Sequence, residues 1–139
     1  MIHLYIEITV KEPRSNTFEK LTNFENFQIQ VPEFYPHLKI KSKRGNVSVI
    51  EQHMVLGKNE FVMMTKHIVN HPKFHEVYVI GGDCKGSHIK EEFVENNGST
   101  KIIVTGKFKT PRKFLIKKAI SQKDLEDDIE SIIKKLVGS

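Results

Sequence analysis

The sequence predicts one α+β domain in which a long antiparallel sheet curls around a single C-terminal helix. Three observations predict this fold. An alternating strand stands at the N-terminus, an almost unbroken series of strands and short turns follows up to about residue 109, and one amphipathic helix closes the chain. A sheet and a helix that each have one apolar face bury those faces against each other. We therefore expect an apolar cavity between the two layers.

Size and composition indicate an ordinary globular protein. The 139 residues have a net charge of +5, with 38% hydrophobic and 28% charged side chains, which suits a single domain over residues 1–139. No signal peptide and no apolar run of about 20 residues is visible. The lone cysteine, Cys84, excludes an internal disulfide and fits a reducing compartment. We expect a cytoplasmic protein.

The first two elements are a strand and a short helical region. Apolar residues occupy every second position from Ile2 to Val10, which is typical of a half-buried strand. Pro13 ends this strand. From Ser15 the spacing becomes helical and predicts that Phe18 and Leu21 are buried, and the same spacing extends to two further phenylalanines, Phe24 and Phe27.

Turn residues divide the next part of the chain into strands. Gly, Asn and Pro clusters separate the predicted strands Leu38–Lys43, Val47–Leu56, Glu60–Val69 and Phe74–Ile80. Asn97-Gly98 is the strongest signal, because both residues tolerate the positive φ angles of a type I′ hairpin. A two-residue loop there pairs Phe93 with Ile102 and Glu91 with Val104, so Glu91 lies on the inner face among apolar side chains.

The last helix is predicted over Ser121–Leu136. Its apolar residues form one stripe, made of Leu125, Ile129, Ile132, Ile133 and Leu136. Ser121 and Asp124 have the spacing of a capping box. We expect the stripe to pack against the sheet.

Most motifs that suggest chemistry are weak. His67, His71 and His75 have a spacing that would suit zinc on a helix, but Pro72 and the flanking strands predict that they diverge, as surface or turn histidines. The glycine-rich segment 81–87 lacks the lysine of a phosphate-binding loop and predicts a bend or bulge. Cys84 has no surrounding signature of a nucleophile. We expect no metal site and no cofactor.

Glu91 is the most informative polar residue. A carboxylate among apolar side chains needs a partner or a raised pKa. It is either a structural hydrogen-bonding or ion-pairing group, or a polar anchor for a ligand or a general acid–base. Methionines at positions 54, 63 and 64 either fill the core or line a pocket, since methionine adapts to irregular shapes.

The basic residues gather in two places, residues 107–118 and 39–44. They form a solvated face or a weak contact with an anionic membrane surface. No DNA- or RNA-binding motif is present, so nucleic acid is not the expected partner. The sequence does not predict an oligomeric state.

The whole chain resembles the START-like or SRPBCC superfamily, which includes polyketide cyclase/dehydrase-type and lipid-transport proteins and the birch-pollen allergen fold. The resemblance lies in the strand ending at Pro13, in Phe18, Leu21, Phe24 and Phe27 before Pro32, in the meander of strands, in the segment 82–91, and in the C-terminal helix. It implies a helix-grip fold, with a seven-stranded antiparallel sheet wrapped around the long C-terminal helix and two short helices after the first strand. It also implies ligands such as lipids, quinones or polyketides, but no shared catalytic residues.

We expect a binding or transport protein for a hydrophobic small molecule, with no catalytic residue assigned. The alternatives are a cyclase/dehydratase-type enzyme using Glu91 with a nearby His or Tyr, and a protein-interaction module with a filled core. The residues expected to line the cavity are Ile89, Glu91, Phe93, Ile102, Val104, Phe108, Met63, Ile129 and Ile133.

Overall fold

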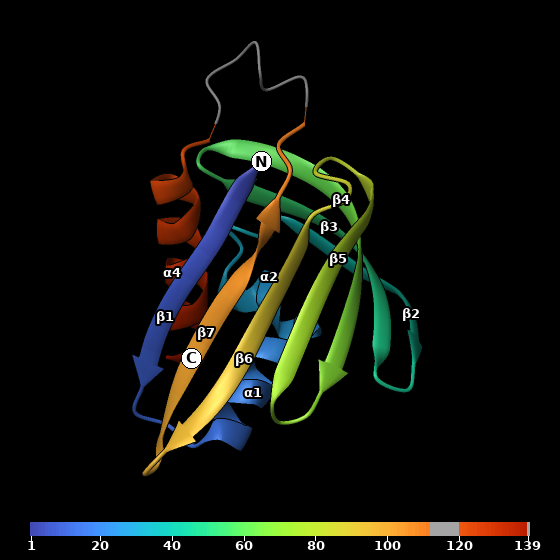
Figure 1. Ribbon diagram of the computed structural model, residues 1–139. Coiled ribbons are helices and arrows are strands. Elements are labelled where there is room, and N and C mark those ends of the chain that lie inside the picture. Colours follow the sequence, from blue (N-terminus) through green and yellow to red (C-terminus); the bar gives the residue numbers. More distant parts are fainter. Residues whose placement is uncertain (112–119, 139) are drawn as a thin grey trace.

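The computed structural model describes residues 1–111 and 120–138, and it has the predicted α+β architecture (Figure 1). The elements in chain order are β1 (Ile2–Val10), α1 (Arg14–Thr22), the 3-10 helix η1 (Phe24–Asn26), α2 (Phe27–Gln30), β2 (His37–Arg44), β3 (Val47–Leu56), β4 (Asn59–Asn70), β5 (Phe74–Gly82), β6 (His88–Asn96), β7 (Ser99–Phe108) and α4 (Gln122–Val137). The predicted strands agree with these bounds to within two residues.

All seven strands form one antiparallel sheet. Its order is β1-β7-β6-β5-β4-β3-β2, so β2 to β7 are a meander and β1 closes the sheet beside β7. The predicted hairpin at Asn97-Gly98 is confirmed, since Asn97 and Gly98 both have positive φ angles. Its register is confirmed as well, with Phe93 opposite Ile102 and Glu91 opposite Val104.

Helix α4 packs along the inner face of the curled sheet (Figure 1). Its predicted apolar stripe faces inward, because Leu125, Ile132, Ile133 and Leu136 are buried. The Ser121 side chain caps the helix by accepting a hydrogen bond of 3.0 Å from the backbone N–H of Asp124. No helix among residues 1–111 and 120–138 is long and apolar enough to cross a membrane.

The helical region after β1 is broken into short pieces. Helix α1 ends at Thr22, and Asn23 leaves the helical conformation with a ψ of 76°. The chain then turns through η1 and α2, and this turn keeps Phe18, Leu21, Phe24 and Phe27 all buried. The helices that carry these phenylalanines lie near the end of the sheet where the β4–β5 turn is found (Figure 1).

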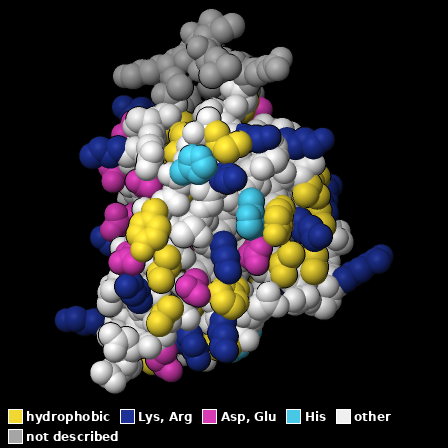
Figure 2. All heavy atoms as spheres, in the orientation of Figure 1, with side chains coloured by type: hydrophobic (Ala, Val, Ile, Leu, Met, Phe, Trp, Pro, Cys, Tyr) yellow, Lys and Arg dark blue, Asp and Glu magenta, His cyan; other side chains and the backbone are white. Residues whose placement is uncertain are grey.

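The outer face of the sheet is a solvated surface. Figure 2 shows lysine and arginine side chains interspersed with acidic and single hydrophobic side chains on this face. Among them, Lys101 pairs with Glu7 at 3.3 Å, and Tyr78 stacks on His88 with ring centroids 4.2 Å apart. The inner face therefore carries the core and any internal site.

Candidate functional site

A cavity of about 100 Å³ lies between the inner face of the sheet and α4. Its apolar wall consists of Leu21, Phe27, Met54, Val77, Ile89, Val104, Ile129, Ile132, Ile133 and Leu136. Its polar wall consists of Tyr35, Gln52, His67, His75 and Glu91. The cavity is thus apolar on the helix side and polar along one part of the sheet.

The register of four strands brings the polar side chains together. His75 in β5 is directly opposite Glu91 in β6, and directly opposite partners share a face of the sheet. His75 is also opposite Val69 in β4, two residues beyond His67, so the two histidines are diagonal neighbours. Gln52 in β3 extends this polar row to the next strand.

These side chains form one continuous chain of hydrogen bonds. Glu91 Oε1 lies 2.5 Å from His75 Nδ1, and His75 Nε2 lies 2.8 Å from His67 Nδ1. His67 Nε2 lies 3.0 Å from Thr65 Oγ1 and 3.2 Å from Gln52 Oε1. The Thr65 hydroxyl also lies 2.8 Å from Gln52 Oε1. Buried polar groups need such partners, and here most of them are other side chains of the inner face.

Each neutral histidine in this chain donates from one ring nitrogen and accepts at the other. His67 bonds to His75 through Nδ1, and its Nε2 lies beside Thr65 Oγ1 and Gln52 Oε1. His75 bonds to His67 through Nε2 and to Glu91 through Nδ1. All four ring nitrogens of the two histidines therefore have a polar partner.

Burial changes the ionisation of two groups in the site. The pKa of His67 lies well below its ordinary value, first because burial disfavours the charged ring and second because His75 is adjacent. The pKa of the Tyr35 phenol is raised, chiefly by burial and further by the negative charge of Glu91. His67 is therefore a neutral ring and Tyr35 a protonated phenol at neutral pH.

Two hydrogen-bonding atoms on the polar wall have no protein partner among the described residues. Tyr35 is only 8% exposed, and its hydroxyl makes no hydrogen bond to any described residue. Glu91 uses Oε1 for His75 but has no such bond at Oε2. A buried tyrosine hydroxyl ordinarily has a partner. The cavity thus contains one unpaired donor and one unpaired acceptor.

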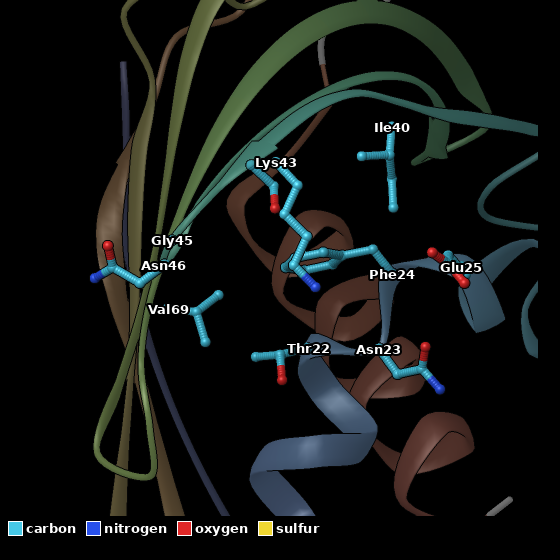
Figure 3. A pocket seen from close by; sticks show the side chains of 10 residues that line it. Thr22, Asn23, Phe24, Glu25, Ile40, Lys43, Gly45, Asn46 and Val69 are labelled. Carbon is cyan, nitrogen blue, oxygen red and sulfur yellow. The ribbon is translucent and has the colours of Figure 1, made fainter.

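Phe24 separates this cavity from a larger pocket of about 460 Å³ that opens to the surface. Its ring packs on His67 and His75, with centroids 4.5 Å and 5.4 Å apart. On its other side it lines the outer pocket, between η1 and the strands that carry Lys43 and Val69 (Figure 3). Phe24 itself is only 6% exposed, and it contacts the polar wall of the cavity through the two histidines.

The residues expected from the sequence to line the cavity fall into two groups. Ile89, Glu91, Val104, Ile129 and Ile133 line it. The other four, Met63, Phe93, Ile102 and Phe108, are buried in the core but do not border this cavity.

The expectation that His67 and His75 are surface or turn histidines was wrong. Both are buried, because the β4–β5 turn lets them approach as diagonal neighbours instead of diverging. His71 lies in that turn and contacts the edge of the Phe18 ring at 5.0 Å. Successive side chains of a strand point to opposite faces. Counting along β4 in steps of two from the buried Phe61 would therefore have placed His67 on the inner face. Among the described residues no group of three or more His, Cys, Asp or Glu could hold a metal ion.

Two other sequence features have structural roles in the fold. The glycine-rich segment forms the predicted irregularity, since the β4–β5 register shifts between Met64 and Thr65, opposite Gly81. Cys84, which lies within this segment, is buried and has a φ of 65°. The basic segment 107–118 lies mostly outside the described residues.

Comparison with known proteins supports the fold. No protein-family model matches the sequence, and no curated protein matches it significantly. Among solved structures, TTHA0849 from Thermus thermophilus is 13% identical, with a TM-score of 0.84 over 98% of this chain and 94% of that one. A START superfamily protein from Mycobacterium smegmatis is 14% identical, with a TM-score of 0.72 over 98% and 94%. The Zhui aromatase/cyclase from Streptomyces sp. R1128 is 11% identical, with a TM-score of 0.75 over 98% and 91%.

These likenesses confirm the resemblance that the sequence predicted, at the level of the fold. The chain has the helix-grip fold of START-like (SRPBCC) proteins, with a seven-stranded sheet, two short helices after β1 and a long C-terminal helix.

Proposed function

We propose that the protein binds a hydrophobic small molecule in the cavity between the sheet and α4. The observation that carries this proposal is the contrast between the two walls of the cavity. The wall formed by α4 and the adjoining strands is apolar, and the opposite wall presents hydrogen-bonding atoms of Tyr35 and Glu91 that are unpaired among the described residues. Small-molecule sites are typically apolar pockets with a few polar groups that orient the ligand.

The size of the cavity limits the ligand that enters without rearrangement. Typical ligand pockets have volumes of roughly 300–1,000 Å³, whereas an engineered cavity of about 150 Å³ is enough for benzene. At about 100 Å³, the cavity is smaller than that, so even a single ring requires some rearrangement of its lining. A larger ligand requires movement of Phe24, which would join the cavity to the outer pocket of about 460 Å³.

The test is a titration with toluene, in which NMR monitors the chemical shifts of the methyl groups that line the cavity. Val77→Phe should abolish binding because the larger ring fills the cavity from β5. Val94→Phe is the matched control, since Val94 is exposed on β6. Binding that survives Val77→Phe, or that is lost equally in both variants, would contradict the proposal. Native mass spectrometry of protein purified from its own host would identify a ligand that remains bound.

A second candidate function is acid–base catalysis on a hydrophobic substrate, as in a cyclase or dehydratase. The observation that favours it is the bond between His75 and Glu91, with His67 as the next group in the chain. A carboxylate paired with a histidine can move a proton to or from a bound substrate. Glu91→Gln should then keep ligand affinity but lose turnover. The Zhui structural neighbour is an aromatase/cyclase, which makes polyketide-like substrates the first to test.

A third candidate is a protein-interaction module with a filled core. It predicts that no small molecule enters the interior. The toluene titration therefore also distinguishes this candidate from the first two, because specific shifts at Val104 and Ile133 require an occupied cavity.

A further inference from the structure

We propose that the cavity selects apolar ligands carrying a hydroxyl group, which accepts a hydrogen bond from Tyr35 and donates one to Glu91 Oε2. This inference rests on the proposed function, since it names the chemical class of the ligand bound in the same cavity. It assigns the choice of ligand to two side chains, Tyr35 and Glu91, that come from separate parts of the chain.

Tyr35 is held as a donor that faces the cavity. Its backbone N–H donates to the Val31 carbonyl at 2.9 Å, and its ring packs on Phe27 with centroids 5.3 Å apart. The next residue, Pro36, restricts the backbone of Tyr35 further. The ring is therefore fixed, but its hydroxyl has no partner among the described residues. A buried phenol proton without an acceptor is a site that a ligand oxygen can satisfy.

Glu91 is held as an acceptor. Its Oε1 lies 2.5 Å from His75 Nδ1, and its Oε2 makes no hydrogen bond to the described residues, so a carboxylate Oε2 is available as an acceptor. The contact with His75 also fixes the carboxylate, because His75 is itself held by His67 at 2.8 Å. The negative charge of Glu91 reaches Tyr35, where it raises the pKa of the phenol, yet no hydrogen bond joins the two side chains. Both side chains line the same cavity, where a ligand group can meet each of them.

A hydroxyl is the group that satisfies both atoms at once. It accepts one hydrogen bond through its oxygen and donates one through its proton. An ether or ketone can accept from Tyr35 but leaves Glu91 Oε2 unpaired. A hydrocarbon leaves both atoms unpaired. Sites built to bond a hydroxyl reject analogues that lack it, because the buried polar groups of the protein then lose their partners.

Charged groups do not fit this wall. The described lining residues include no Lys or Arg, so a ligand carboxylate would meet Glu91 without a compensating cation. An ammonium group would have to leave water for a cavity whose other walls are apolar. Burial of an unpaired charge is far costlier than burial of a neutral hydroxyl.

The test compares probes of matched size. p-Cresol and anisole are isomers that differ in whether the oxygen carries a proton, toluene lacks the oxygen, and benzoate carries a charge. Affinities are measured by calorimetry for the wild type, for Tyr35→Phe and for Tyr78→Phe. Tyr78 is the matched control because it lies on the outer face and stacks on His88.

We expect the wild type and Tyr78→Phe to bind p-cresol roughly 10- to 100-fold more tightly than anisole, with toluene weak and benzoate undetected. Tyr35→Phe should weaken p-cresol and anisole together, because the oxygens of both accept from Tyr35, and should therefore lower the preference for p-cresol over toluene by roughly tenfold. Equal binding of p-cresol, anisole and toluene by the wild type would overturn this inference and leave the proposed function intact. An unchanged preference for p-cresol over toluene in Tyr35→Phe would overturn it too. Failure of all three neutral probes to bind would contradict the proposed function itself.

Discussion

Glu91 Oε1 and His75 Nδ1 lie 2.5 Å apart at directly opposite positions of β6 and β5. Both side chains are largely removed from solvent, with 13% of Glu91 and 5% of His75 exposed. The bond therefore anchors the polar wall of a cavity whose other walls are apolar. It is also one end of a continuous row of hydrogen-bonded side chains that runs through His75 and His67 to Gln52.

Removal of one partner of this pair should destabilise the fold. Glu91→Ala leaves His75 without its acceptor, and breaking a buried pair in this way costs about 3–5 kcal/mol. Urea denaturation measures the change. Glu95→Ala is the control on the same strand, where Glu95 is exposed, and should change the free energy of unfolding by less than about 0.5 kcal/mol. Equal effects of the two substitutions would show that the pair contributes nothing.

Stability should fall as the pH decreases from about 7 to 5.5. Unfolded His67 takes up a proton near its ordinary pKa of 6.5, whereas in the folded protein burial and His75 keep its pKa well below that value. The unfolded state thus binds more protons in this window, and acid favours it by up to about 1.4 kcal/mol per pH unit. The carboxylates with lowered pKa values, Glu7, Glu51 and Glu76, titrate below this window.

The measurement is urea denaturation of the wild type and of His67→Gln at several pH values. His75 is present in both proteins. The difference between them in the slope of unfolding free energy against pH is therefore due to His67. We expect a shallower pH dependence for the variant. A variant with the same slope as the wild type would show that His67 does not resist protonation in the folded state.

Tyr35→Phe should leave the free energy of unfolding unchanged or raise it. The Tyr35 hydroxyl is buried and makes no hydrogen bond to the described residues, so its removal costs no partner. Most substitutions of buried side chains destabilise a protein instead. A loss of more than about 1 kcal/mol on thermal or urea denaturation would mean that the hydroxyl has a structural role.

Phe24→Ala should both destabilise the protein and speed ligand entry. Loss of the buried ring costs about 3–5 kcal/mol. It also removes the side chain that separates the outer pocket from His67 and His75. Stopped-flow mixing with p-cresol measures the association rate, which should rise relative to wild type. Ile29→Ala, at an exposed position of α2, should change neither quantity. An unchanged association rate for Phe24→Ala would place the entrance elsewhere.

The sequence predicted the half of the site that depends on local turn chemistry. Asn97-Gly98 defines the register of β6 and β7, and that register alone is enough to place Glu91 on the inner face. The stripe of α4 followed from its helical spacing in the same way.

The other half depends on relationships between segments. His67 and His75 meet through the pairing of β4 with β5, and the turn at residues 71–73 between them does not determine that register from its residues alone. Tyr35 lies in a non-repetitive turn after α2, where no periodicity indicates which side chains face inward. The position of its hydroxyl is set by packing on Phe27, a contact that only the folded chain creates.

The most direct test of the central claim is to locate a bound probe by NMR. Intermolecular nuclear Overhauser effects from the methyl group of toluene are measured to the methyl groups of the protein. The account predicts effects to Val77, Val104 and Ile133, whose side chains line the cavity from β5, β7 and α4. Effects confined to the exposed Val62, Ile80 and Val94 on the outer face would show that the cavity does not bind the probe.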